Sequence, residues 1–563
     1  YIAPSRGFQS STEYTQTIGL GALKQVDSVR VTWFDDKVTV LRTPKAGTTL
    51  TLAHKDGRVT PGASMQRTQP VHQTAPTLFT NVPATFDSHV EDKYEDFFDE
   101  RNIPMKLSSE GPKAAIGDVN GDGRQDVYIG GAKGQGGQLY LQTGVGFTKS
   151  NQPIFKELSD FEDTAAQFFD ADKDGDLDLF VGSGGNEVPT GSGTLMNRLY
   201  LNDGKGTFQL NTRALPQTTM NTSVAIPYDY DRDGDLDLFV GSRSYPKEYG
   251  VSPPSYIYQN NGAGEFMDVT KRIAPDFADL GMIRDAAWAD LNGDGRSELV
   301  VVGDWMSPQA FSYNGGSFVR MNTGLAEFTG MWGGLAVADI DGDKDNDLII
   351  GNIGENFSLN ANAEHPLKLW VNDFDKNGIL DKVMTKTIDG KDVPVYLKRE
   401  MADQFPFLKS KILKHSDYAT KTLQDLFPAP VLEASQIKTL TYRRSIVAIN
   451  DGKGTFTVRD LPDAVQMTCV NAIACEDLNN DGRSDVVLGG NFTHFTPQLG
   501  MIDACQGIVL MSQPGGMFRV LSSKESGYLT SGEVKQISPL IINRQRYLLN
   551  LVNNAPPALF KQR

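Results

Sequence analysis

Cysteine is scarce in this chain of 563 residues: only Cys469, Cys475 and Cys505 occur, all of them late in the sequence. That count excludes a scaffold stapled by several disulfides. A single disulfide bridge that leaves one free thiol is compatible with three cysteines, and nothing in their spacing indicates which two would pair. The chain also lacks any run of 18 apolar residues, so we expect no transmembrane helix.

Positive charge is in deficit as well, with 54 Lys and Arg against 70 Asp and Glu and a net charge of −16. A nucleic-acid binder is therefore not the default expectation, because phosphate binding needs a basic face. An anionic membrane surface is an equally poor direct partner. Disorder is excluded, since 39% of the residues are hydrophobic and only 22% are charged.

The length exceeds one ordinary core of roughly 100–200 residues. We therefore expect either one large repeat architecture with an appended domain or three to four small domains. The chain begins at Tyr1 without Met or a signal peptide, which indicates a processed or partial chain, the C-terminal portion of something longer.

A nine-residue pattern recurs seven times. It reads acid, any residue, Asp or Asn, any residue, Asp or Asn, usually Gly, two further residues, and acid. Internal repetition of this kind points to a repeat architecture. The copies, called loops 1 to 7, begin at Asp118, Asp170, Asp229, Asp290, Asp339, Asp373 and Asp477.

The pattern suits a hard cation. Side-chain oxygens at positions 1, 3, 5 and 9 and the carbonyl at position 7 can converge on one point, while Gly at position 6 permits the sharp turn. The predicted ligands are Asp118, Asn120, Asp122, Arg124 and Asp126; Asp170, Asp172, Asp174, Asp176 and Asp178; Asp229, Asp231, Asp233, Asp235 and Asp237; Asp290, Asn292, Asp294, Arg296 and Glu298; Asp339, Asp341, Asp343, Asp345 and Asp347; Asp373, Asp375, Asn377, Ile379 and Asp381; and Asp477, Asn479, Asp481, Arg483 and Asp485.

Calcium is the expected ion, with about seven sites. Six or more oxygens in a flexible loop favour Ca²⁺ over Mg²⁺, which demands octahedral geometry, and the absence of His and Cys from the loops disfavours zinc. The alternative is an Asx turn without metal, which would crowd several carboxylates together. That alternative is strongest for loop 5, where Lys344 replaces Gly.

The loops are not EF-hands. An EF-hand has a bidentate Glu at position 12 and continues as a helix, whereas position 12 is apolar in every copy here. The residues are Ile129, Val181, Val240, Val301, Ile350, Met384 and Leu488. In most copies a short β-rich run ended by Gly follows the loop, which predicts a buried strand.

A hairpin signature follows most loops: a strand, an Asn- or Gly-rich turn, and a second strand. It occurs at 199–208, 257–266 and 447–456, and in weaker form at 139–147 and 311–318. Strand, metal loop, strand and hairpin together give four strands in about 50–60 residues, the content of one propeller blade.

With these loops and hairpins, residues 78–563 resemble the FG-GAP/VCBS repeat family, the integrin-α-like β-propellers whose blades carry calcium loops. The resemblance implies an all-β fold: a calcium-binding β-propeller, with seven blades expected and six or eight left open. Blades should begin near residues 114, 165, 224, 286, 334 and 472. A metal-free last blade at 530–563 is closed by strands near 78–86.

Loop 6 follows loop 5 after only 34 residues, and loop 7 follows after 104 more, so the spacing departs from one loop per blade. We infer that loop 6 is a second site inside blade five. Apolar residues at helical spacing over 397–427 predict an insertion of two helices around Pro406 and Ser416, a cap or docking surface rather than a catalytic element.

Residues 1–53 differ from the rest. Segments 29–33 and 38–41 alternate like paired strands with Asp35–Asp36 as the turn. With Ile18-Gly-Leu-Gly21 and Trp33-Phe-Asp-Asp36 in place of the usual FGLG and WPDG motifs, this segment resembles the ASPIC/UnbV module, a small β-domain. Residues 54–77 are expected to form a linker.

The resemblance implies a non-enzymatic, calcium-stabilised binding or scaffold protein on the outer face of the bacterial outer membrane, lipid-anchored through a missing N-terminal part, or secreted. The implied partners are a TonB-dependent transporter and its lid lipoprotein, in a complex that takes up glycans or peptides. Candidate ligand-binding residues, for which loop packing is the simpler interpretation, are Tyr245, Tyr249, Trp305, Asn356, Phe357, Phe492, His494 and Phe495.

Two other functions remain open. Some calcium-dependent polysaccharide lyases are propellers, and a lyase needs a base beside a polarised uronate. None of the six His is paired with a nucleophile or an acid at a recognised spacing, so we do not expect an enzyme. An integrin-like adhesion module would differ mainly in binding protein rather than glycan.

The predicted metal loops change the interpretation of the negative net charge. About a third of the acidic residues stand at ligand positions of the loops. Seven divalent ions would bring a chain of −16 close to neutrality, which reopens the question of anionic partners. Without the ions, repulsion within each loop should destabilise the fold, so we expect a calcium-dependent propeller.

Overall fold

The computed structural model describes residues 5–7, 10–11, 15, 17–33, 37–57, 77–144 and 146–563. The chain divides into two compact units, Tyr1–Ala75 and Pro76–Arg563. The predicted turn at Asp35–Asp36 and most of the predicted linker lie outside the described residues.

Within its described residues, the first unit contains two strand pairs and a short 3₁₀ helix. Strand β1 (Ser5–Gly7) pairs with β2 (Ser10–Ser11), β3 (Ser28–Thr32) pairs antiparallel with β4 (Val38–Arg42), and η1 spans His54–Asp56. In the second pair Val31 lies opposite Thr39. The pairing predicted from the alternation of segments 29–33 and 38–41 is therefore confirmed.

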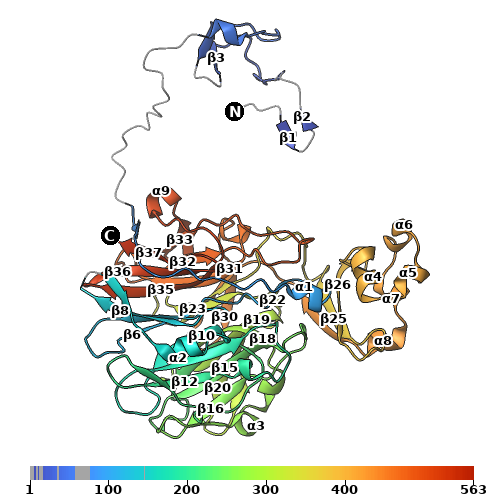
Figure 1. The fold of residues 1–563 in the computed structure, drawn as a ribbon. Helices are drawn as coiled ribbons and strands as arrows, with labels where there is room; N and C mark the ends of the chain where they lie inside the picture. The colour runs from blue at the N-terminus through green and yellow to red at the C-terminus, as the bar shows by residue number, and fades with distance from the viewer. Residues whose placement is uncertain are drawn as a thin grey trace. The chain divides into compact units, whose positions relative to one another are not determined.

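The second unit is built on seven four-stranded antiparallel sheets (Figure 1). Sheets one to three are β6 (Ala114–Gly117), β7 (Asp126–Ile129), β8 (Gln138–Thr143), β9 (Gly146–Lys149); β10 (Glu162–Phe169), β11 (Asp178–Gly184), β12 (Arg198–Asn202), β13 (Phe208–Leu210); and β14 (Asn221–Tyr228), β15 (Asp237–Ser244), β16 (Tyr256–Asn260), β17 (Phe266–Asp268). Sheets four and five are β18 (Met282–Ala289), β19 (Glu298–Met306), β20 (Gln309–Tyr313), β21 (Phe318–Arg320), with β22 (Gly330–Met331) beside β19; and β23 (Gly334–Ala338), β24 (Asp347–Gly351), β29 (Ile446–Asn450), β30 (Phe456–Asp460). Sheets six and seven are β31 (Val470–Glu476), β32 (Asp485–Gly490), β33 (Ile508–Gln513), β34 (Met517–Val520); and β35 (Val534–Ile542), β36 (Gln545–Val552), β37 (Ala558–Gln562), β5 (Phe79–Val82).

The sheets form a closed ring. The first strand of each sheet contacts the first strand of the next, and β35 returns to β6. The seventh sheet takes its outer strand from the beginning of the unit, because β5 pairs antiparallel with β37, with Val82 opposite Leu559. Closure packs the last sheet against the first, so no sheet face is left uncovered at the end of an open array, and the fold is the all-β propeller that the repeats predict.

The second strand of each sheet lies in the core, and its residues are buried almost throughout. In β15, for example, Leu238, Phe239 and Val240 have no more than 1% of their surface exposed. Runs of this composition suit strands covered on both faces. The apolar clusters lie between successive sheets.

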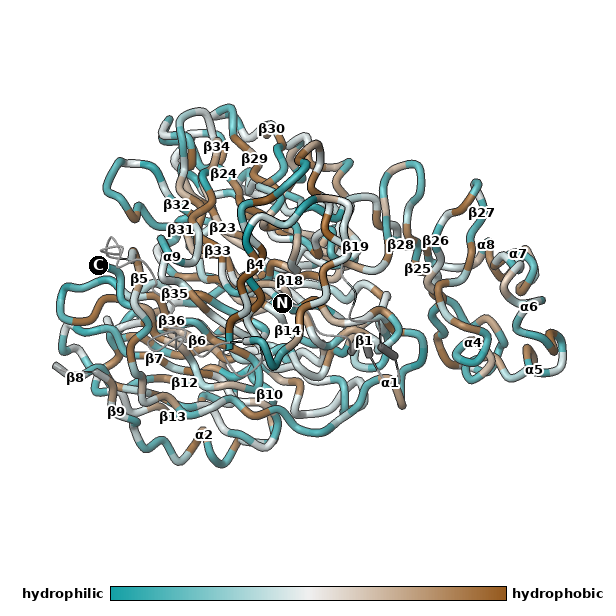
Figure 2. Tube along the Cα trace, turned by 90° about the horizontal axis from the view of Figure 1, so that it is seen from above, coloured by the Kyte–Doolittle hydropathy of each residue, from teal (hydrophilic) through white to brown (hydrophobic). Residues whose placement is uncertain are grey.

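An insertion between β24 and β29 forms a sheet of its own, which corrects the expectation that loop 6 belongs to blade five. The order is β27 (Lys391–Pro394), β26 (Asp381–Ile388), β25 (Leu367–Asn372) and β28 (Gln436–Leu440). Loop 6 joins β25 to β26, so both of its flanking strands belong to the inserted sheet. Figures 1 and 2 both show the insertion projecting from one side of the ring.

Five short helices accompany this sheet, where two were expected. They are α4 (Lys398–Gln404), α5 (Leu408–Lys411), α6 (His415–Tyr418), α7 (Leu423–Leu426) and α8 (Ala429–Glu433). Pro406 and Pro428 interrupt the helical run, and Thr422 begins α7 with a capping box.

The remaining helices are α1 (Asp96–Asp99), α2 (Pro153–Glu157), α3 (Thr270–Ile273), α9 (Ser523–Ser526), η2 (Gly193–Leu195), η3 (Pro275–Asp279) and η4 (Val465–Met467). Among the described residues, no helix is long and apolar enough to span a bilayer. The three cysteines are free.

Candidate metal centres

Loops 1 to 5 and 7 join the first strand of a ring sheet, at its edge, to the second strand, and loop 6 joins β25 to β26, the two central strands of the inserted sheet. The backbones of all seven loops share two left-handed residues. Position 6 has a φ between +76° and +93° in every loop, including Lys344 in loop 5. Position 4 is also left-handed in every loop, although only three copies have Gly there. The sequence pattern treated position 4 as free and missed this second turn, because Lys, Arg and Asn occupy it elsewhere.

The loops are held by their own side chains. In each one the carboxylate at position 1 accepts a hydrogen bond from the backbone N–H of position 6, at 2.7–3.2 Å. The side-chain oxygen at position 5 accepts one from the N–H of position 7, at 2.8–3.1 Å. Both are local bonds of the Asx-turn kind, so nine residues suffice to specify the loop.

Position 9 is different, because its carboxylate lies in the core. It accepts the N–H of position 2 in six loops, at 2.8–3.1 Å. In loops 1, 2, 3, 5 and 7 its other oxygen accepts a backbone N–H from the third strand, at 2.7–2.9 Å. This acid therefore connects the metal loop to its sheet.

Burial raises the pKa of every acid at position 9. The pKa reaches about 6 for Asp126 and Asp347, about 7 for Asp178 and about 8 for Asp237. A buried carboxylate resists ionisation unless a positive charge lies beside it. A cation in the loop would supply that charge.

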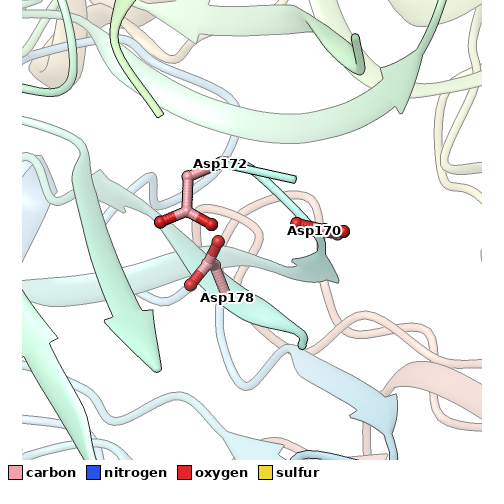
Figure 3. Close-up of side chains that lie close together, drawn as sticks. All are labelled: Asp170, Asp172 and Asp178. Carbon is pink, nitrogen blue, oxygen red and sulfur yellow. The ribbon is translucent and has the colours of Figure 1, made fainter. Parts of the chain in front are cut away.

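In four loops the carboxylates of positions 1, 3 and 9 converge. One oxygen from each lies within 4.8 Å of the others in loops 2, 3, 5 and 6, and Figure 3 shows Asp170, Asp172 and Asp178 of loop 2. Loops 1, 4 and 7 have Asn at position 3.

Each converging cluster also contains a buried carboxylate oxygen without a hydrogen-bond partner among the described residues. These oxygens belong to Asp170, Asp237, Asp341 and Asp375. Unpartnered buried oxygens are rare in folded proteins, and convergent carboxylates are the donor set of Ca²⁺. The residues present therefore fit a calcium ion.

Position 7 carries Arg in three loops, Asp in three loops and Ile379 in loop 6. Arg124 in loop 1 and Arg483 in loop 7 pair with the carboxylates of Asp122 and Asp481 at position 5, both at 2.5 Å. In loop 3, Asp235 pairs with Lys173 of loop 2. Such pairs balance charge at the loop surface and leave positions 1, 3 and 9 for a metal.

Asn side chains connect neighbouring metal loops, a feature that the sequence pattern did not reveal. The Nδ2 of Asn260, at the end of β16, donates to the carbonyl of Ala171 in loop 2 at 2.8 Å and to that of Leu236 in loop 3 at 3.1 Å. Asn202 makes the same two contacts between loops 1 and 2, and Asn450 between loops 4 and 5. We call these three residues the asparagine bridges.

Most of the predicted ligand-binding aromatics lie in a packed core. Tyr249, Trp305, Phe357, Phe492 and Phe495 are buried in one cluster that joins the insertion to the ring. The indole N–H of Trp305 donates to the hydroxyl of Tyr249 at 2.8 Å. Ile103, Met105 and Leu107 belong to the same cluster.

The other three predicted residues are more accessible. Tyr245 is half-buried and Asn356 is exposed. His494 is half-buried, and its Nδ1 lies 3.1 Å from Glu533. Glu533 also pairs with Lys535 at 2.7 Å. The positive charge beside Glu533 holds the pKa of its carboxyl well below its usual range.

Comparison with models of known protein families supports the repeats found in the sequence. A family model described as FG-GAP-like repeat matches residues 118–181, 170–240 and 290–350, and one described as ASPIC and UnbV matches residues 1–59. No curated protein matches the chain.

Several solved structures resemble the chain distantly. The biofilm matrix protein Bap1 of V. cholerae is 12% identical over 86% of this chain and 91% of its own, with a TM-score of 0.36. YCF48 from Cyanidioschyzon merolae is 9% identical over 82% and 98%, with a TM-score of 0.38. The extracellular domain of the putative hybrid two-component system BT4673 from B. thetaiotaomicron is 10% identical over 86% and 40%, with a TM-score of 0.37.

Likenesses this distant support no statement about function. The matched repeats, their loops and the closed ring of sheets do identify the architecture. The chain is a β-propeller built on FG-GAP-like repeats and carries an N-terminal ASPIC and UnbV module.

Proposed function

We propose that this chain is a non-enzymatic, calcium-stabilised binding or scaffold protein of the bacterial cell surface. The observation that carries the proposal is the repetition of one loop design in seven places, each with its patterned acids bound into the sheet framework. Acids used in this way stabilise the fold rather than react with a substrate. Calcium, when bound, offsets part of the negative charge of the carboxylates in each loop.

The binding face is proposed to be the one opposite the six metal loops of the ring sheets. The loops follow the ends of the first strands, whereas the insertion leaves the ring where β24 ends, at the other end of the sheets. Long connections and insertions on a rigid scaffold are where binding residues usually lie. We propose that this face docks to an outer-membrane complex for glycan or peptide uptake.

Calcium dependence is the first test. At millimolar calcium, loops with dissociation constants of about 10⁻⁴–10⁻³ M would each add about 0.4–1.4 kcal/mol of stability. Seven such loops sum to roughly 3–10 kcal/mol. Chelation should lower the melting temperature, and calcium but not magnesium should restore it. Bound calcium is counted by elemental analysis, and a metal-free protein with an unchanged melting temperature would refute the proposal.

The binding role needs a separate test. The calcium-loaded chain, immobilised on beads, is incubated with detergent-solubilised outer membranes and with glycan and peptide arrays. A chain lacking residues 359–440 of the insertion serves as the comparison, since the ring sheets lie outside that segment. Retention of a transporter complex or array ligand by the intact chain alone supports the proposal. Release of unsaturated uronate from a polysaccharide, seen as rising absorbance, would instead reveal a lyase.

A further inference from the structure

A polar cavity lies on the axis of the ring, away from the metal loops. Its lining comes mainly from the beginnings of the first strands: Lys113, Thr164, Ser223, Arg284, Asn471 and Lys535. The six metal loops of the ring sheets follow the opposite ends of these first strands. Arg284 precedes the first residue of loop 4 by six residues of extended chain, roughly 20 Å. We call this space the channel cavity.

Four cationic side chains line the channel cavity, Lys113, Arg243, Arg284 and Lys535, against one acidic side chain, Glu110. Two of these four cationic side chains already pair with acidic side chains of the protein. Arg243 pairs with Glu110, and it also pairs with Asp304 at 3.0 Å. Lys535 pairs with Glu533 at 2.7 Å and donates to the carbonyl of Ser109 at 2.9 Å.

The other two cations have donors to spare. The Arg284 side chain is only 9% exposed, yet within the described residues its nearest acidic partner, Asp304, lies 3.6 Å from Nη1 and no hydrogen bond forms. Lys113 makes one hydrogen bond, to the carbonyl of Lys535 at 3.3 Å. A guanidinium offers five N–H donors and an ammonium three. Buried donors without acceptors are costly, so both groups favour an acceptor in the cavity.

The acids nearby already have partners for most of their oxygens. Asp285 accepts the backbone N–H groups of Ala286 at 2.9 Å and Leu335 at 2.9 Å. Asp304 accepts two N–H bonds from Arg243 through Oδ2, at 3.0 and 3.3 Å. Its Oδ1 accepts no hydrogen bond within the described residues and lies 3.6 Å from Nη1 of Arg284, an ion pair that is too long for a hydrogen bond. Neither carboxylate supplies the hydrogen bonds that Arg284 lacks.

The size of the cavity limits what can enter. About 30 Å³ is free for the centres of water-sized molecules, more than the roughly 10–15 Å³ that one water requires. A group of a few heavy atoms fits this space, and a sugar ring does not.

We propose that the channel cavity binds a small monovalent anion, a halide or a carboxylate group, between Arg284 and Lys113. A planar guanidinium matches a carboxylate in two parallel hydrogen bonds, and an ammonium beside it adds a second charge. This site is independent of the metal loops and of the proposed surface function.

The test uses the calcium-loaded full chain and two probes, sodium bromide and sodium acetate. Crystals soaked in bromide should give an anomalous peak between Arg284 and Lys113. Acetate titrated by calorimetry at constant ionic strength should bind the native chain, with affinity reduced at least tenfold in Arg284→Gln and in Lys113→Gln, because each removes a charged donor. Arg519→Gln, which removes an exposed ion pair with Glu525, is the matched control and should bind acetate like the native chain.

Two results would overturn the proposal. One is the absence of bromide from the cavity of the native crystal together with no acetate heat, which means that water alone fills the space. The other is equal acetate affinity in the native chain and both cavity variants. If Arg284→Gln fails to fold, Lys113→Gln and the native crystal still decide the matter. The stronger of the two probes then distinguishes a halide site from a carboxylate site.

Discussion

Replacing Asn260 by Leu tests whether the asparagine bridges couple neighbouring metal loops. Asn260 is 5% exposed and donates to the carbonyls of Ala171 and Leu236 in two different loops. Leucine has similar volume but no donor, so both carbonyls would lose their partner. An unsatisfied buried group costs about 1–3 kcal/mol, which gives roughly 2–6 kcal/mol for the pair.

The magnitude can be converted to a melting temperature. The unit Pro76–Arg563 has an unfolding entropy of about 2.1 cal/mol/K per residue, so 1 kcal/mol corresponds to about 1 °C. We expect Asn260→Leu to melt about 2–6 °C lower than the native chain in calcium. At limiting free calcium, equilibrium dialysis should show a loss of up to two bound ions, from loops 2 and 3, because one bridge serves both.

The matched control is Asn261→Ala, the next residue. Asn261 is exposed, and its side chain bonds only within its own turn. Its loss should leave calcium binding unchanged. A melting point of Asn260→Leu within 1 °C of the native value, with full calcium occupancy, would show that the bridges do not couple the loops.

Three further predictions follow from single residues. Lys344→Gly should raise the melting temperature by about 1 °C, because Lys344 is held at a φ of +77° where glycine is unstrained; Lys149→Gly, in strand β9, should lower it. Gln404→Ala removes the 2.8 Å hydrogen bond from α4 to Asp381 of loop 6, so limited proteolysis should cut the insertion faster and leave the ring intact; unchanged cleavage would show that this bond does not hold α4. His89 is 4% exposed with neither ring nitrogen hydrogen-bonded in the described part of the chain, and burial lowers its pKa to about 4. Between pH 6.5 and 4, His89 is therefore protonated in the unfolded state but remains neutral in the folded state. The free energy of unfolding consequently falls as the pH falls through this range. The loss is on the order of 3 kcal/mol. His89→Gln should not show this loss when the melting temperatures of the variant and the native chain are compared at pH 7 and pH 4.5. The same decrease in melting temperature in both proteins would refute the assignment to His89.

The blade framework could be predicted because its signals are local. Metal loop, buried strand and hairpin each occupy about ten residues, and every loop closes through bonds between its own positions 1, 5, 6 and 7. The first strands begin within four residues of the predicted starts, at Ala114, Glu162, Asn221, Met282, Gly334 and Val470.

The insertion could not be predicted in the same way. Its strands β25 and β28 are separated by more than sixty residues of sequence, yet they pair directly, with Trp370 opposite Ile437. Loop 6 looks like any other metal loop in the sequence, because the local pattern does not show which sheet its flanking strands join.

The sequence by itself determined where the acids lie, that they recur in a form suited to calcium, and that four strands accompany most of them. These properties depend on neighbours within nine residues. Only the tertiary structure decided which oxygens are buried, which asparagines bridge adjacent loops, and which cations meet on the ring axis. Arg284 lies on β18 and Lys113 immediately precedes β6 of another sheet, and closure of the ring brings them to the same cavity.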